Sequence, residues 1–166
     1  MNIFSQSSQT WMSLKAGARD FTDASLLQRP LVVLLTGDSR DTRCLGEKYI
    51  HAFEREFFFL DAASVSGKDY GETIDLLREN INKKGAVLLH DLQNLNGNQA
   101  QALHVVCDRD SPMVRDAVVV LTADKSLNEI GDKWRNHVSA DKLPALLTRI
   151  GSRIVAVSSE NRLPCA

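Results

Sequence analysis

Short apolar runs at regular intervals are the feature of this sequence that most restricts its fold. The runs read LVVLLT at 31–36, FFFL at 57–60, AVLL at 86–89, AVVVLT at 117–122 and RIVAV at 153–157. Continuous apolar runs of this length are typical of strands that are buried on both faces of a parallel sheet. Each run is therefore predicted to be a strand.

The segments between these runs have apolar residues at the spacing of an amphipathic helix. The predicted helices span 9–21, 41–56, 69–82, 98–106 and 124–138, and one more begins near Asp141 and ends at Gly151. Strands that alternate with helices of this length require right-handed crossovers, which place helices on both faces of the sheet. We therefore expect a three-layer, Rossmann-like α/β domain over 23–166, with a mainly parallel sheet and a helical lead-in over 1–22.

The helix before the last run has signals at both of its ends. Asp141 is a suitable N-cap, Pro144 is tolerated in the first turn, and Gly151 fits the left-handed position that ends many helices. Arg149 lies in the last turn, where a positive side chain interacts favourably with the helix dipole. That is the ordinary interpretation of Arg149, and the alternative is that it is presented to the phosphates of another protein.

The charge balance excludes some classes of partner. The chain has 20 Lys and Arg residues against 21 Asp and Glu residues, which gives no positive field to recruit nucleic acid or an anionic membrane. No apolar run approaches the roughly 20 residues that a membrane span requires. We expect a chain that is soluble as written, with any membrane attachment provided by a segment of a parent protein outside it.

The loop after the first predicted strand lacks the pattern of a nucleotide site. It reads TGDSRDTRC at 36–44, without the GxxxxGK[ST] of a phosphate-binding loop, and no GxGxxG occurs in the chain. Carboxylates at Asp38 and Asp41 would repel a triphosphate. We therefore expect a domain that has no phosphate-binding loop and needs no cofactor.

Other candidate sites carry weaker signals. The strand-end sequence AVLLHD resembles the acidic strand end that holds magnesium in P-loop ATPases, but its single Asp91 is better interpreted as a cap of the following turn. No GxSxG is present, and a charged loop at 108–110 is expected to be solvated. The possible metal ligands lack a recognised spacing; they are His90, His104 and Cys107. One alternative left open is a small α/β hydrolase or nucleotide-dependent enzyme with a site around Asp38, Ser39 and Asp91.

Three cysteines, Cys44, Cys107 and Cys165, occur without a CxxC pair. Each taken alone is best interpreted as a small buried hydrophobic residue. Cys165 differs because it is one residue from the end of the chain, where little core is available. A disulfide that holds the tail explains Cys165 better than a free thiol, and it would imply an oxidising compartment.

Several stretches, taken in order, resemble the luminal domains of the torsin-interacting proteins, the family of lamina-associated polypeptide one and its endoplasmic-reticulum relative. The matching stretches are LLTGDSRDTRCLGEKYIHA (34–52), TIDLLRENINKKGAVLLHDLQNL (73–95), VVCDRDSPMVRDAVVVLT (105–122), DKLPALLTRIGSRIVAV (141–157) and the terminal Cys165. Together they cover most of 30–166.

This resemblance implies a AAA+-like domain that has lost nucleotide binding and acts as a regulatory subunit. Such a domain would bind ATP-bound torsin, a AAA+ ATPase of the endoplasmic-reticulum lumen and perinuclear space, and activate it. The position that matches the family's arginine finger is Arg149, and the family's disulfide maps to Cys44 and Cys165, which would leave Cys107 free. A degenerate AAA+-like scaffold without an arginine finger remains an alternative.

Overall fold

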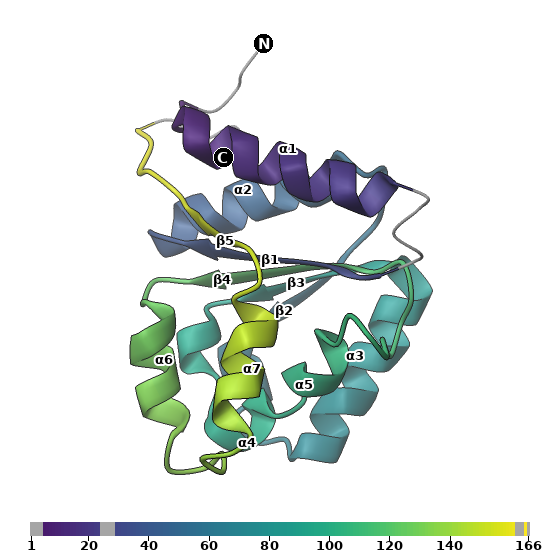
Figure 1. The fold of residues 1–166 in the computed structure, drawn as a ribbon, viewed down its shortest axis with the longest axis vertical. Coiled ribbons are helices and arrows are strands. Elements are labelled where there is room, and N and C mark those ends of the chain that lie inside the picture. Colours follow the sequence, from purple (N-terminus) through teal and green to yellow (C-terminus); the bar gives the residue numbers. More distant parts are fainter. Residues whose placement is uncertain (1–4, 24–28, 162–164, 166) are drawn as a thin grey trace.

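The computed structural model describes residues 5–23, 29–161 and 165 (Figure 1). Its five strands form one sheet in the order β2-β3-β4-β1-β5, in which every pairing is parallel. The strands are β1 (Leu31–Thr36), β2 (Phe58–Asp61), β3 (Ala86–His90), β4 (Val118–Ala123) and β5 (Ile154–Ala156). The predicted strands and the three-layer α/β class are confirmed.

The helices form a layer on each face of the sheet. They are α1 (Ser8–Thr22), α2 (Ser39–His51), α3 (Tyr70–Lys84), α4 (Gly97–Ala100), α5 (Leu103–Val106), α6 (Leu127–Trp134) and α7 (Leu143–Ile150), with short 3-10 turns at Ala62–Val65 and Leu92–Asn94. Figure 1 shows α1 and α2 over one face of the sheet and α3 to α7 over the other. The predicted boundary at 22–23 adjoins 24–28, which lie outside the described residues.

Alternate residues of strand β1, which lies between β4 and β5, enter two separate cores. Val32 and Leu34 pack into the core beneath α3 to α7, whereas Leu31, Val33 and Leu35 pack beneath α1 and α2. Because both faces of the strand are buried, its sequence is continuously apolar instead of alternating. This explains why the strand signal in the sequence was strong.

Some predicted helix boundaries were wrong. The expected helix 98–106 is divided into α4 and α5, because Ala102 and Val105 donate to carbonyls three residues earlier, at Gln99 and Ala102, which tightens the chain between them. The helix expected over 41–56 ends at His51, before Glu54 adopts a left-handed φ of 57°. The helix expected over 124–138 ends at Trp134.

The last helix, α7, ends at Gly151 as predicted, but the Asp141 cap and the left-handed conformation expected of Gly151 were wrong. The N-cap position is Lys142, without a side-chain cap bond, so Asp141 does not cap the helix. Gly151 has a φ of −99°, which is not left-handed. Glycine is nevertheless needed at this position, because a Cβ there would lie 2.6 Å from the Leu127 side chain and 2.9 Å from the Leu147 carbonyl.

Trp134 anchors α6 in the larger core. Its side chain is fully buried and its indole Nε1 donates to the Leu95 carbonyl at 2.8 Å. We expect Trp134→Ala to lower the free energy of unfolding by about 3–5 kcal/mol, since it removes a large buried side chain and leaves a cavity. Trp134→Phe is the matched control, with a smaller expected loss because it mainly leaves the Leu95 carbonyl unpaired. Urea unfolding would measure both, and a loss below about 1 kcal/mol for the alanine variant would contradict this role.

The C-terminal segment returns over the starts of α1 and α2. The backbone amide of Val157 donates to the Thr36 carbonyl at 2.8 Å. The side-chain amide of Gln6 donates to the Ser158 carbonyl and to the Glu160 carboxylate. A disulfide joins Cys44 of α2 to Cys165, as the family resemblance implies. Cys107 is free and fully buried, and burial raises the pKa of its thiol to about 12, so the thiol is unreactive. Within the described ranges, no helix is long and apolar enough to cross a membrane.

Candidate functional site

Arg149 lies in the last turn of α7 and is held from one side by the segment around α5. Its Nη1 donates to Nδ1 and to the carbonyl oxygen of His104, each at 2.9 Å. Its Nη2 lies 3.4 Å from Oδ2 of Asp108, and 37% of the side chain remains exposed. The guanidinium is therefore oriented by acceptors and still reaches the surface.

Asp108 has a structural role that the sequence did not reveal. It belongs to the charged loop that was expected to be solvated, but its side chain is only 20% exposed. Its Oδ1 accepts the backbone amides of Asp110 and Ser111, which, with Arg149 nearby, hold the pKa of the carboxyl below its usual range. The expectation of a solvated loop was wrong at this residue.

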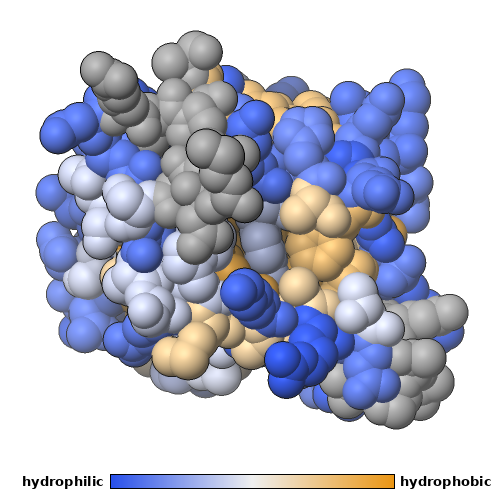
Figure 2. Space-filling model, turned by 90° about the horizontal axis from the view of Figure 1, so that it is seen from above, coloured by the Kyte–Doolittle hydropathy of each residue, from blue (hydrophilic) through white to orange (hydrophobic). Residues whose placement is uncertain are grey.

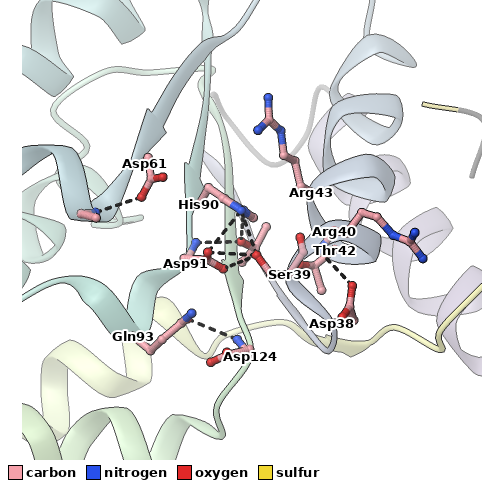
Figure 3. A network of polar contacts seen from close by, with 12 residues as sticks. Asp38, Ser39, Arg40, Thr42, Arg43, Asp61, His90, Asp91, Gln93 and Asp124 are labelled. Atoms are coloured by element: carbon pink, nitrogen blue, oxygen red, sulfur yellow. Dashed lines mark hydrogen bonds and ion pairs between the residues drawn. The ribbon is translucent and has the colours of Figure 1, made fainter. Parts of the chain in front are cut away.

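The start of α2, where a phosphate-binding loop would cradle phosphate, is filled by the chain's own carboxylate. Asp38 caps the helix and accepts the amides of Arg40 at 3.0 Å and Asp41 at 3.2 Å (Figure 3). Free amides at a helix start are what make it a phosphate site. Asp38 competes directly with any phosphate for these two donors.

The loop before α2 is also covered by the C-terminal segment. Gly37 has a φ of 149°, and a Cβ at this position would lie 2.6 Å from the Val157 carbonyl oxygen. Glycine is therefore required here for close contact between two backbone segments, instead of for contact with a nucleotide.

Removing the Asp38 side chain tests its capping role. We expect Asp38→Ala to lower the free energy of unfolding by about 1 kcal/mol, because two amides of α2 lose their acceptor. Asp38→Asn keeps an acceptor of the same size and is expected to be nearly neutral. Chemical denaturation of the two variants would check this, and equal stability would contradict the cap.

Ser39, His90 and Asp91 meet at the carboxyl ends of β1 and β3, as Figure 3 shows. The Ser39 hydroxyl lies 2.9 Å from both Asp91 carboxylate oxygens and 3.1 Å from Nε2 of His90. On its other side, Nδ1 of His90 lies 2.8 Å from the hydroxyl of Thr122, which also accepts the Asp91 amide. The candidate site around Asp38, Ser39 and Asp91 is thus only partly assembled, because Asp38 faces the helix amides.

The hydrogen bonds of this cluster differ from those of a serine hydrolase. A hydrolase needs an imidazole acceptor for the serine proton and a third group that orients the imidazole from its far side. Here the carboxylate of Asp91 accepts the Ser39 proton and lies 3.3 Å from Nε2 of His90, on the same side of the ring as the serine. A carboxylate facing Nε2 favours a proton on that nitrogen, which makes it a donor.

Two interpretations from the sequence need further correction at this site. Asp91 adopts a left-handed conformation and makes no side-chain cap bond, so its carboxylate binds Ser39 instead of capping the next turn. The possible ligands His90, His104 and Cys107 do not come together, and no group of three metal-ligating side chains occurs in the described part of the chain.

The fold is that of AAA+ proteins. The Saccharomyces cerevisiae Hsp104-ADP complex matches with a TM-score of 0.59 and 14% identity, over 93% of this chain and 33% of that chain. AMPPCP-bound DnaA from Aquifex aeolicus also matches with a TM-score of 0.59, at 12% identity, over 95% of this chain and 49% of that chain. This likeness shows that the domain has a AAA+-like α/β fold.

In sequence, the chain is similar to Torsin-1A-interacting protein 1. The rat and bovine proteins are 24% identical to it, over an alignment that covers 81% of this chain. The chain spans only 30% and 29% of the lengths of these two relatives. No protein-family model matches the chain.

Proposed function

We propose that this chain binds a torsin AAA+ ATPase in its ATP-bound state and stimulates ATP hydrolysis by supplying Arg149 in trans as an arginine finger. The observation that carries the proposal is that Arg149 is held in one orientation at the surface. Its guanidinium is oriented by His104 and Asp108 while its side chain remains 37% exposed. An arginine suits this role because it stays charged and binds phosphate oxygens through a planar fork.

The positions of Arg149 and of the blocked nucleotide site support a domain that supplies an arginine to a partner and does not bind ATP itself. Asp38 and Asp91 follow the carboxyl ends of β1 and β3, whereas Arg149 lies in the last turn of α7, the helix that returns the chain to the start of β5. Figure 1 shows α7 between α6 and α5, and Arg149 contacts the α5 side. A partner's nucleotide could therefore approach Arg149 without contact with the segment that covers Gly37.

The partner and the compartment are inferred from the relatives and from the disulfide. The relatives' name states an interaction with torsin-1A. A disulfide between Cys44 and Cys165 would persist in an oxidising compartment, in agreement with the endoplasmic-reticulum lumen and perinuclear space. The chain would then act as a regulatory subunit and not as an enzyme.

The direct experiment adds the purified chain to torsin and measures ATP hydrolysis. We expect saturable stimulation, together with capture of torsin that is trapped with ATP in preference to torsin with ADP. The chain alone should neither bind nor hydrolyse ATP. Absence of both binding and stimulation would contradict the proposal, whereas binding without stimulation would support the scaffold alternative.

A further inference from the structure

His104 makes two hydrogen bonds to a single nitrogen of Arg149. Nη1 carries two hydrogens, and it contacts Nδ1 and the carbonyl oxygen of His104 at 2.9 Å each. A guanidinium can only donate, so Nδ1 must be the acceptor. The imidazole is therefore neutral in this arrangement and carries its proton on Nε2.

The remaining donors of Arg149 are available to a ligand. Of five N–H groups, Nη1 uses both of its own on His104, and Nη2 directs one toward Asp108. The Nε hydrogen and the second Nη2 hydrogen have no hydrogen bond within the described ranges. These are the kind of paired donors that bind a phosphate or carboxylate in a fork.

We propose that His104 is a positioning residue for Arg149: its neutral imidazole fixes the guanidinium in place for the partner's nucleotide, and protonation of His104 releases it. This inference rests on the proposed function, because it assumes that Arg149 acts on a bound nucleotide. Holding a flexible side chain in its working geometry before binding lowers the entropy lost on binding. Protonation would place an Nδ1–H donor 2.9 Å from Nη1, with two like charges in contact.

The charged and titratable groups around His104 make its protonated form unfavourable. Arg149 and Lys142 face it from α7, Asp108 follows α5, and Tyr70 of α3 lines the same surface hollow. Burial, followed by the charges of Arg149 and Lys142, lowers the pKa of His104 from its ordinary value of 6.5. The Lys142 carbonyl and Asp108 oppose this shift.

The surroundings of the other ring nitrogen, Nε2, also disfavour a positive charge on His104. Nε2 is buried and has no hydrogen-bond partner in the described part of the chain, although the nearby Lys142 backbone acts to raise the pKa against the other effects. Because its pKa is lowered, the neutral form of His104 that accepts from Arg149 is favoured.

The expected pH dependence of stimulation follows from the lowered pKa of His104. Stimulation should be full above the pKa of His104, where Nδ1 accepts, and should fall as the pH drops through that lowered pKa. His104→Asn places a side-chain oxygen close to the position of Nδ1 and cannot titrate in this range. The variant should therefore keep stimulation at pH 7.5 and remove the acidic loss.

The experiment measures torsin ATP hydrolysis with the full chain from pH 5 to 8, and divides each rate by that of torsin alone. His104→Ala should lower stimulation about tenfold at pH 7.5, the effect of restoring one side chain's freedom. His104→Asn should match the parent at pH 7.5 and exceed it at acidic pH. Imidazole nitrogen NMR of the chain without torsin should show the proton of His104 on Nε2.

Two sets of results would overturn the inference. If the parent stimulates torsin and Arg149→Ala does not, but both His104 variants retain the parent's rate and pH profile, the positioning role is wrong and the proposed function stands. A proton on Nδ1 at neutral pH would also reject it. If the parent itself fails to stimulate, or Arg149→Ala stimulates fully, the proposed function fails and this inference fails with it.

Discussion

Replacing Arg149 with alanine is expected to abolish the stimulation of torsin. An arginine finger contributes roughly 10³ to 10⁵ in rate, or about 4–7 kcal/mol of transition-state stabilisation. The guanidinium donates to charge that develops on the transferred phosphoryl group, and alanine has no donor to replace it. Capture of torsin should be reduced much less than the rate, because the interaction is strongest in the transition state.

Two further variants make this test specific. Arg149→Lys keeps the charge but loses the planar fork, so only partial stimulation is expected. Arg135→Ala is the matched control, since Arg135 also lies at the end of a helix, with an ion pair to Asp132, but is 71% exposed. The control should stimulate as the parent does. Full stimulation by Arg149→Ala would remove the finger mechanism.

Loss of the disulfide is expected to produce the second large effect, on stability. The bond between Cys44 and Cys165 joins positions 121 residues apart. In the chain-entropy model, closing a loop of this length contributes up to about 5 kcal/mol, because the crosslink restricts the unfolded chain. Cys165→Ser should lower the free energy of unfolding by an amount approaching this value.

Urea unfolding with and without a reducing agent would measure the effect. The parent should lose stability on reduction, whereas Cys165→Ser should be unaffected by the same reagent, which serves as the control. Intact mass should increase by about two units when the parent is reduced. Three free thiols in the unreduced parent, or equal stability with and without reducing agent, would contradict the disulfide's role.

Much of the fold could be predicted because its signals are local. A strand buried on both faces must be apolar along its whole length, so runs such as 31–36 and 86–89 could be recognised as strands. The absence of a working phosphate loop was equally local, because it depends on residues adjacent in the chain, with Asp38 next to the start of α2. Helix ends were less predictable, since Gly151 is required by packing against Leu127 and not by its own backbone angles.

The candidate site was harder to predict because the residues that contact each other in it are distant in sequence. Arg149 could be singled out by its place in α7 and by the family resemblance, but the residues that hold it could not. His104 lies 45 positions earlier, and it appeared in the sequence only as a possible metal ligand. Asp108 appeared as part of a solvated loop, and Asp91 as a cap instead of a partner of Ser39.

The sequence by itself determined that this chain forms a parallel α/β sheet, that Asp38 stands where a phosphate loop would need free amides, and that an arginine lies in the last turn of the last helix. Only the tertiary structure decided the order of the strands, the acceptors of Arg149 and the pairing of Ser39 with Asp91. The physical reason is that hydrophobic periodicity and capping act over a few neighbouring residues. Contacts between α5 and α7, or between β3 and α2, depend instead on how the helices pack across the sheet.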